Sequence, residues 1–164
     1  MPEFYSPARR PQDEEQRQHA VDATGIVSRR GDPALPRVVA EAAQQLSAPI
    51  AAVSILDRDR QWFAARIGLE SEETPRAVSF CAHAVLSPHQ PLVVFDAARD
   101  SRFAGNPLVV GPPGIRFYVG MPLVSRDGYA LGALCVIDLS PRTEACNLHA
   151  LRALAHEAER IIEG

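Results

Sequence analysis

The chain has 164 residues, of which 46% are hydrophobic and 23% charged, and this composition predicts one globular domain with a tail. Its formal net charge of −3 provides no global basic field, so we expect neither nucleic-acid binding nor direct contact with an anionic membrane. Three cysteines without a CxxC pair argue against a disulfide framework or a structural zinc site, and no apolar run is long enough to span a membrane. We therefore expect a cytoplasmic protein.

The N-terminal part of the chain predicts a tail followed by two helices. Residues 1–11 contain three prolines and no periodic pattern, so we expect a disordered tail. Residues 12–27 carry only a weak apolar stripe, and we assign residues 12–32 to a marginal signalling or dimerisation helix and a linker. Residues 33–47 repeat apolar side chains at intervals of three and four, which predicts an amphipathic helix. It opens a single domain over residues 33–164.

The rest of the chain predicts an α+β fold. Five segments have the pattern of strands, two pairs of them forming hairpins: 50–56, 61–67, 91–95, 115–124 and 130–137. Between the strands lie an acidic loop at 68–75, a short helix at 78–86 with Ser79 as N-cap, and a long loop at 96–113. A final helix extends from Thr143 to Glu163. We expect the terminal helices on one face of the sheet, and the short helix and long loop on the other.

The strand at 115–124 alternates clearly between two faces. Ile115 and Phe117 begin one face, whereas Arg116, Tyr118 and Gly120 share the other, where the glycine leaves room. A guanidinium beside a phenol suits an anionic or ring-bearing ligand. The alternative is that Arg116 pairs with an aspartate of the long loop, Asp96 or Asp100, and holds that loop in place.

Cys81 and His83 lie two positions apart in the short helix, so their side chains point about 200° away from each other. This spacing disfavours a catalytic Cys–His pair and a metal site formed by both. One interpretation is a buried thiol with a structural histidine, and the other is that His83 reaches a ligand cavity.

Several linked segments resemble a bacterial subgroup of GAF domains found in sensor histidine kinases and diguanylate cyclases. They are RDRQWFAARIGL (58–69), ETPRAVSFCAHAV (73–85), PLVVFDAARDSRFAGNPLV (91–109), GIRFYVGMPL (114–123) and GYALGALCVID (128–138). The resemblance implies a six-stranded antiparallel sheet of the GAF (profilin-like) type, a ligand cavity between the sheet and the loops, and homodimerisation through the terminal helices. Five strands are predicted from the residues, so one strand has no counterpart in the sequence pattern.

The resemblance implies a regulatory function and names no ligand or cofactor. We expect a small-molecule sensor without enzymatic activity, which passes its state through the terminal helices to an effector domain, in the same chain or in a partner. The side chains expected around the ligand are Phe80, Cys81, His83, Asp96, Phe103, Arg116, Tyr118 and Cys135. We expect no metal site.

Two alternative functions stay open at this point. One is a redox sensor or small redox enzyme that acts through Cys81 or Cys135. The sequence lacks the clustered cysteines of free methionine sulfoxide reductases, because the relevant strand reads GIRFY, and it lacks the lysine of the cyclic-nucleotide GAF signature. The other alternative is a ligandless dimerisation module with a filled core.

Overall fold

The computed structural model describes residues 4–29, 32–144 and 147–164. Its strands form one six-stranded sheet in the order β3-β2-β1-β6-β5-β4, in which every pair of neighbours is antiparallel. The strands are β1 (Ile50–Asp57), β2 (Arg60–Ile67), β3 (Glu73–Pro75), β4 (Leu92–Val94), β5 (Phe117–Val124) and β6 (Ala130–Asp138). The predicted α+β class and antiparallel sheet are confirmed.

The strand without a sequence counterpart is β3. It lies inside the predicted acidic loop and pairs with β2, where Thr74 is opposite Gln61. Three residues containing a glutamate and a proline have no apolar alternation, so the pattern that identifies the longer strands is missing here.

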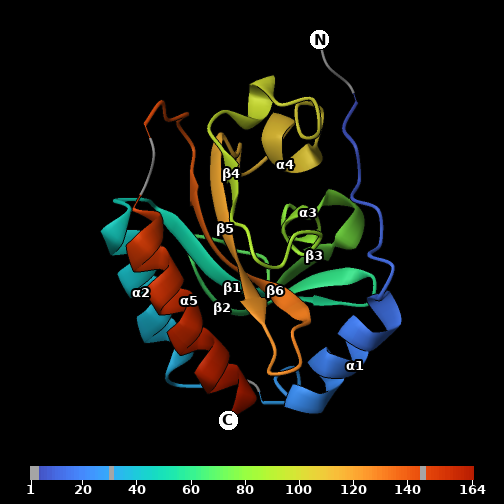
Figure 1. Ribbon diagram of the computed structural model, residues 1–164. Helices are drawn as coiled ribbons and strands as arrows, with labels where there is room; N and C mark the ends of the chain where they lie inside the picture. Colours follow the sequence, from blue (N-terminus) through green and yellow to red (C-terminus); the bar gives the residue numbers. More distant parts are fainter. Residues whose placement is uncertain (1–3, 30–31, 145–146) are drawn as a thin grey trace.

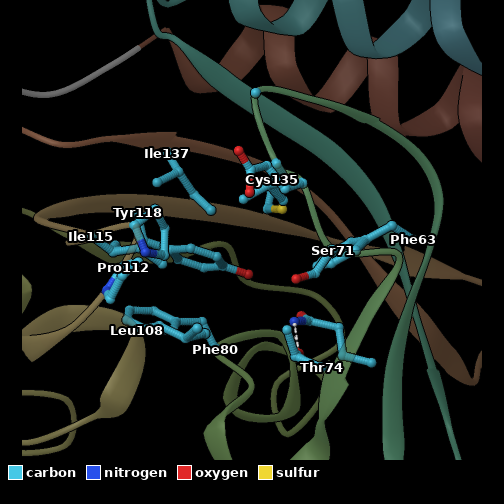
Figure 2. Close-up of a pocket in the computed structure, with 15 residues that line it drawn as sticks. Phe63, Ser71, Thr74, Phe80, Leu108, Pro112, Ile115, Tyr118, Cys135 and Ile137 are labelled. Atoms are coloured by element: carbon cyan, nitrogen blue, oxygen red, sulfur yellow. Dashed lines mark hydrogen bonds between the residues drawn. The ribbon is translucent and has the colours of Figure 1, made fainter.

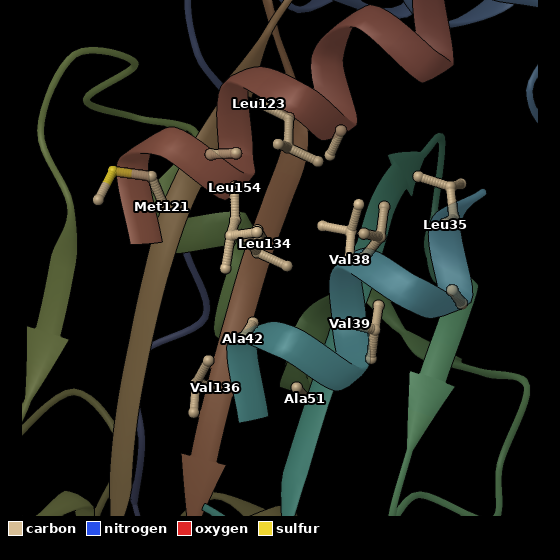
Figure 3. Packing of buried hydrophobic residues seen from close by; sticks show 14 of the residues in the cluster. Leu35, Val38, Val39, Ala42, Ala51, Met121, Leu123, Leu134, Val136 and Leu154 are labelled. Atoms are coloured by element: carbon tan, nitrogen blue, oxygen red, sulfur yellow. The ribbon is translucent and has the colours of Figure 1, made fainter. Parts of the chain in front are cut away.

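Two helices cover one face of the sheet, as expected. They are α2 (Leu35–Gln45) and α5 (Leu148–Glu163), which lie side by side in Figure 1. Asn147 caps α5 by accepting a hydrogen bond from the backbone of Ala150, so the helix begins later than the predicted Thr143; residues 145–146 lie outside the described part of the chain. Figure 3 shows the apolar stripes of both helices meeting the sheet, and this layer is the larger core of the protein.

The first helix, α1 (Glu14–Thr24), occupies a different place. It lies at the ends of β1 and β6, away from the α2–α5 pair in Figure 1. The guanidinium of Arg17, only 1% exposed, donates to the carbonyls of Leu56 and Ala130. The apolar stripe of this helix is weak, and the buried arginine, which donates to carbonyls at the strand ends, helps to hold the helix against the sheet.

The opposite face of the sheet carries the short helices and the long loop. A 3₁₀ turn (Arg76–Val78) leads into α3 (Cys81–Ala84). Phe80, not the predicted Ser79, is the N-cap residue of α3, but the hydroxyl of Ser79 accepts a hydrogen bond from the backbone of Ala82. The loop between β4 and β5 contains a second 3₁₀ turn (Ala97–Arg99) and α4 (Pro107–Val110). The side chain of Asn106 caps α4 and also donates to the carbonyl of Val78, which ties the loop to the turn before α3.

The N-terminal segment runs along this long loop. Residues 4–11 form no helix or strand before α1, but Ser6 donates its amide to the carbonyl of Arg102, and Gly105 donates to that of Phe4. The prediction of a disordered tail stays a prediction for the chain in solution; its residues 1–3 lie outside the described residues.

Candidate functional site

A cavity of about 330 Å³ lies between the sheet, the β2–β3 loop and α4 (Figure 2). Its volume is at the lower end of the range for small-molecule pockets. The lining is mostly apolar and comes from segments far apart in sequence: Gln61, Phe63, Gly68, Leu69, Glu70, Ser71, Thr74, Phe80, Leu108, Pro112, Pro113, Ile115, Tyr118, Cys135 and Ile137. Glu70 and Ser71 are exposed at its mouth.

Tyr118 provides a polar atom without a partner in this cavity. The side chain is 1% exposed, and among the described residues nothing makes a hydrogen bond with its hydroxyl group. Figure 2 shows the ring crossing the cavity between Cys135 and Phe80, with the hydroxyl toward Ser71. Burying an unpaired hydroxyl costs stability, so its presence needs an explanation.

Gly120 makes the position of Tyr118 possible. A Cβ atom on Gly120 would lie 2.4 Å from the tyrosine hydroxyl oxygen, so any larger residue would displace the ring. In the β5–β6 pairing Tyr118 is opposite Ile137 and Gly120 is opposite Cys135, so all four lie on the cavity face of the sheet. The prediction that Gly120 leaves room beside Tyr118 is therefore confirmed.

The polar end of the cavity is a chain of hydrogen bonds. Gln61 donates to the hydroxyl of Thr74 at 2.9 Å and accepts from the hydroxyl of Ser79 at 3.0 Å. Ser79 in turn accepts from the amide of Ala82 at the start of α3. These hydrogen bonds fix the Thr74 hydroxyl at the cavity wall. Through Ser79 they also connect this wall to the start of α3.

Aromatic rings form another wall. Phe80 lines the cavity with its ring centre 5.0 Å from that of Tyr118, and Phe103 stacks on the far side of Phe80 at 4.1 Å, nearly parallel. Phe103 itself does not line the cavity, so it supports Phe80 from behind. His83 packs edge-on against Phe103 at 4.8 Å.

Three of the eight predicted ligand-binding side chains line the cavity: Phe80, Tyr118 and Cys135. The other five lie elsewhere. Cys81 is buried in a separate apolar cluster between α3 and the sheet. Asp96 caps the Ala97–Arg99 turn by accepting from the amide of Ala98.

His83 points away from the cavity and toward the N-terminal segment. Its Nε2 is 2.9 Å from the carbonyl oxygen of Ser6, and burial lowers the pKa of this imidazole. A neutral imidazole donates to such a carbonyl. Cys81 and His83 thus face different neighbours, as their spacing predicted.

Arg116 departs from the predicted alternation. Its guanidinium donates to the carbonyls of Val109 and Ile115, both at 2.9 Å, and so holds the end of the long loop. Regular β5 begins only at Phe117, so strand alternation does not apply to the two residues before it. Ile115 accordingly turns into the cavity and Arg116 away from it. Neither predicted aspartate pairs with Arg116: Asp100 binds Arg102 instead.

The thiol at the cavity wall is not activated. Burial raises the pKa of Cys135 to about 12, and burial also raises the pKa of Cys81. Thiolates are the reactive form of cysteine, so neither thiol is favoured as a nucleophile near neutral pH. Cys146 lies outside the described residues.

The sequence prediction missed most of the wall contributed by the β2–β3 region. Phe63 and Leu69 lie on it, together with Thr74. Adjacent aromatic residues on a strand must face opposite sides, and here Phe63 takes the cavity side while Trp62 packs against the helix-covered core. That alternation was available from the sequence, but which of the two rings faces the cavity was not.

A salt bridge links the rim of the cavity to α1. Arg76 follows Thr74 by two residues, and its guanidinium binds both carboxylate oxygens of Glu14, at 2.6 and 3.0 Å. Arg17 binds the same carboxylate at 2.9 Å. Burial alone would raise the pKa of Glu14, but the hydrogen bonds from Arg76 and Arg17 outweigh it and lower that pKa to about 2.

Other kinds of site find little support in the described residues. No three His, Cys, Asp or Glu side chains there gather in a way that would hold a metal ion. Nor does any helix within these ranges have the length and apolar character needed to cross a membrane.

Comparison with known proteins identifies the family. The model of the GAF domain family matches residues 31–162. A cyclic di-GMP phosphodiesterase of Pseudomonas aeruginosa is 48% identical over 132 residues, which are 80% of this chain and 22% of that protein. The chain thus spans less than a quarter of this relative.

Solved structures share the fold at low sequence identity. The GAF domain of an Acinetobacter phosphoenolpyruvate-protein phosphotransferase has a TM-score of 0.63 at 17% identity, covering 90% of this chain and 92% of that one. A type II free methionine-R-sulfoxide reductase from Thermoplasma acidophilum has a TM-score of 0.64 at 11% identity, covering 89% and 94%. At such identities the likeness concerns the fold alone.

The expectation of a chain without enzymatic activity is contradicted by these comparisons. The relative at 48% identity is named as a phosphodiesterase, and one structure with the same fold is named as a reductase. The expectation relied on the absence of known catalytic patterns from this chain. Their absence carries no information about the activities of longer proteins that contain such a domain.

Proposed function

Because the chain belongs to the GAF domain family, we propose that it is a regulatory domain that binds a small molecule and controls an effector in cyclic di-GMP signalling. The observation that carries this proposal is the preformed cavity, with the unpaired Tyr118 hydroxyl in its wall. A dimerisation module without a ligand would be expected to have a filled core, with neither a cavity nor an unsatisfied polar group in its wall. A redox function through Cys81 or Cys135 is not favoured, because burial raises the pKa of both thiols.

The effector is proposed from the relative's name. That protein is a cyclic di-GMP phosphodiesterase, and the matched part is 22% of its length. We infer that this chain regulates the synthesis or breakdown of cyclic di-GMP by an effector in the same polypeptide or in a partner. A histidine kinase effector and homodimerisation through the terminal helices stay predictions, as does a location in the cytoplasm.

The proposed mechanism is a population shift through α1. A ligand that contacts Thr74 would bias the position of β3, and Arg76 connects the end of β3 to Glu14. A ligand shifts a two-state equilibrium only through contacts that differ between the states. We infer that the Arg76–Glu14 bridge would differ between the two states, since it joins a cavity strand to a helix that the main core does not hold by a broad apolar face.

Native mass spectrometry with a cavity-filling variant tests the proposal. The full chain is incubated with small-molecule extract of the cells that produce it, and bound mass is measured. In Leu108→Trp the indole would occupy the cavity, whereas Val110→Trp places the same ring on the exposed side of the same helix. We expect a bound small molecule in the wild type and in Val110→Trp but not in Leu108→Trp. The same bound mass in all three proteins, or in none, would contradict ligand binding in this cavity.

A further inference from the structure

We propose that the cavity selects an uncharged, flat ring system that carries one hydrogen-bond acceptor, and that Tyr118 donates to this acceptor. The inference rests on the proposed function and specifies its ligand. It also implies that the cavity does not bind cyclic di-GMP itself.

The charge of the lining disfavours an anionic ligand. Among the described residues that line the cavity there is no arginine or histidine, and the one charged side chain in the lining is the exposed carboxylate of Glu70. An anion that entered would lose its hydration without gaining a cation, which is strongly unfavourable. A nucleotide with two phosphates would meet this penalty twice.

The neighbouring guanidinium groups are engaged elsewhere. Arg116 donates to two loop carbonyls, and Arg76 binds Glu14. Arg66 is exposed, and its guanidinium donates to the backbone carbonyls of Leu69 and Glu70, which shapes the mouth of the cavity. Turning Arg116 or Arg76 inward would leave part-buried acceptors without donors, and Arg66 does not belong to the lining of the cavity.

The shape and polarity of the walls favour a ring. Phe63, Phe80 and Tyr118 line the cavity, and the stacked Phe103 holds Phe80 in place. Leu108 and Ile137 close the other sides with aliphatic groups (Figure 2). Offset stacking and edge contacts between rings add to the free energy gained by burying apolar surface.

The hydrogen bond at Tyr118 determines the polar group of the ligand. Burial raises the pKa of this phenol well above its usual value, so the hydroxyl keeps its proton and can donate it. Gln61 and Thr74 already bond to each other, whereas the Tyr118 hydroxyl has no partner among the described residues. An acceptor atom on the ligand would satisfy it.

Three small probes of similar size, and cyclic di-GMP as a fourth, test this chemistry on the full chain. Quinoline and naphthalene differ by one ring nitrogen, an acceptor that is uncharged at neutral pH, and 2-naphthoate adds a negative charge. Binding is followed by chemical shifts of the backbone amides around the cavity, such as those of Gly68 and Leu108. The variant Tyr118→Phe removes the donor and keeps the ring, and Tyr129→Phe is a control in the β5–β6 turn, outside the cavity.

We expect Tyr118→Phe to weaken quinoline binding about tenfold and to leave naphthalene binding unchanged or stronger. Tyr129→Phe should change neither affinity, and 2-naphthoate should bind more weakly than both neutral probes. Equal effects of Tyr118→Phe on quinoline and naphthalene, or tighter binding of the anion or of cyclic di-GMP, would overturn the ligand class while leaving a ligand-binding cavity. If no probe shifts the cavity amides, the ligand class and the proposed function both fail.

Discussion

At the residue scale, Tyr118 combines an energetic cost with the binding function proposed for it. Its hydroxyl is buried without a partner among the described residues, and Gly120 is the residue that permits this placement. Strained or unsatisfied groups in folded proteins concentrate where a ligand is bound, because the ligand supplies the missing interaction. If the proposal is correct, the cost in the ligand-free protein and the gain on binding have one origin.

Removing the hydroxyl should stabilise the ligand-free protein. We expect Tyr118→Phe to raise the free energy of unfolding by about 1 kcal/mol, because an unpaired buried polar group is deleted while the ring stays. Urea denaturation of both proteins measures this difference. The control Tyr129→Phe should stay within about 0.5 kcal/mol of the wild type. A loss of stability in Tyr118→Phe would mean that the hydroxyl has a partner in the folded protein.

The cavity thiol should be unreactive in the folded state. Burial raises the pKa of Cys135 to about 12, so its thiolate is scarce near neutral pH. We expect iodoacetamide to modify Cys135 only when the protein unfolds, with peptide mapping by mass spectrometry to separate it from the other two cysteines. Rapid labelling of Cys135 in the folded protein would instead favour the redox alternative.

At the element scale, the sequence predicted the long elements and the short strand β4, and it missed β3 and α4. Long periodic segments such as α2 and β6 agree with their predicted ranges to within two residues. β3 is too short to show a pattern, and it was missed. Both kinds of result follow from the fact that periodicity needs several repeats to be recognised.

The candidate site was predicted less completely than the fold. Tyr118 lies in regular β5, and alternation placed it on the correct face, whereas Arg116 lies just before that strand and turned the other way. Side chains on loops depend on tertiary contacts such as those of Arg116 with Val109 and Ile115, which a sequence does not show. Whether Phe80, Tyr118 and Cys135 contact a ligand stays a prediction.

The docking of α1 should depend on Glu14. We expect Glu14→Gln to lower the free energy of unfolding by about 1–3 kcal/mol, because Arg17 and Arg76 lose their shared carboxylate. Glu15→Gln, an exposed change in the same helical turn, is the matched control and should have little effect. Urea denaturation provides the comparison.

The same carboxylate predicts a pH dependence. Its pKa falls from the ordinary 4.5 to about 2 on folding, so its contribution is present above about pH 4.5 and is lost as the pH falls toward 2. The stability difference between wild type and Glu14→Gln should therefore shrink as the pH is lowered through this window. A stability difference that stays constant over this pH window would show that the charge of Glu14 does not stabilise the docking of α1.

At the scale of the whole molecule, the sheet separates two regions. The face under α2 and α5 is a continuous apolar core, whereas the other face holds the cavity and the loops around it (Figures 1 and 3). α1 is attached at the strand ends and reaches the cavity side through Arg76. In the proposed relay, a signal from the cavity would reach α1 through this contact. The main core would not need to rearrange, and densely packed interiors resist such rearrangement.

Hydrogen–deuterium exchange of α1, measured by mass spectrometry with and without saturating quinoline, tests most directly whether cavity occupancy reaches this helix. We predict that quinoline changes the exchange of the α1 amides several-fold in the wild type, while those of α5 change little. In Glu14→Gln the effect should be confined to peptides around the cavity. Protection of the cavity peptides in the wild type with unchanged exchange in α1 would contradict the proposed relay.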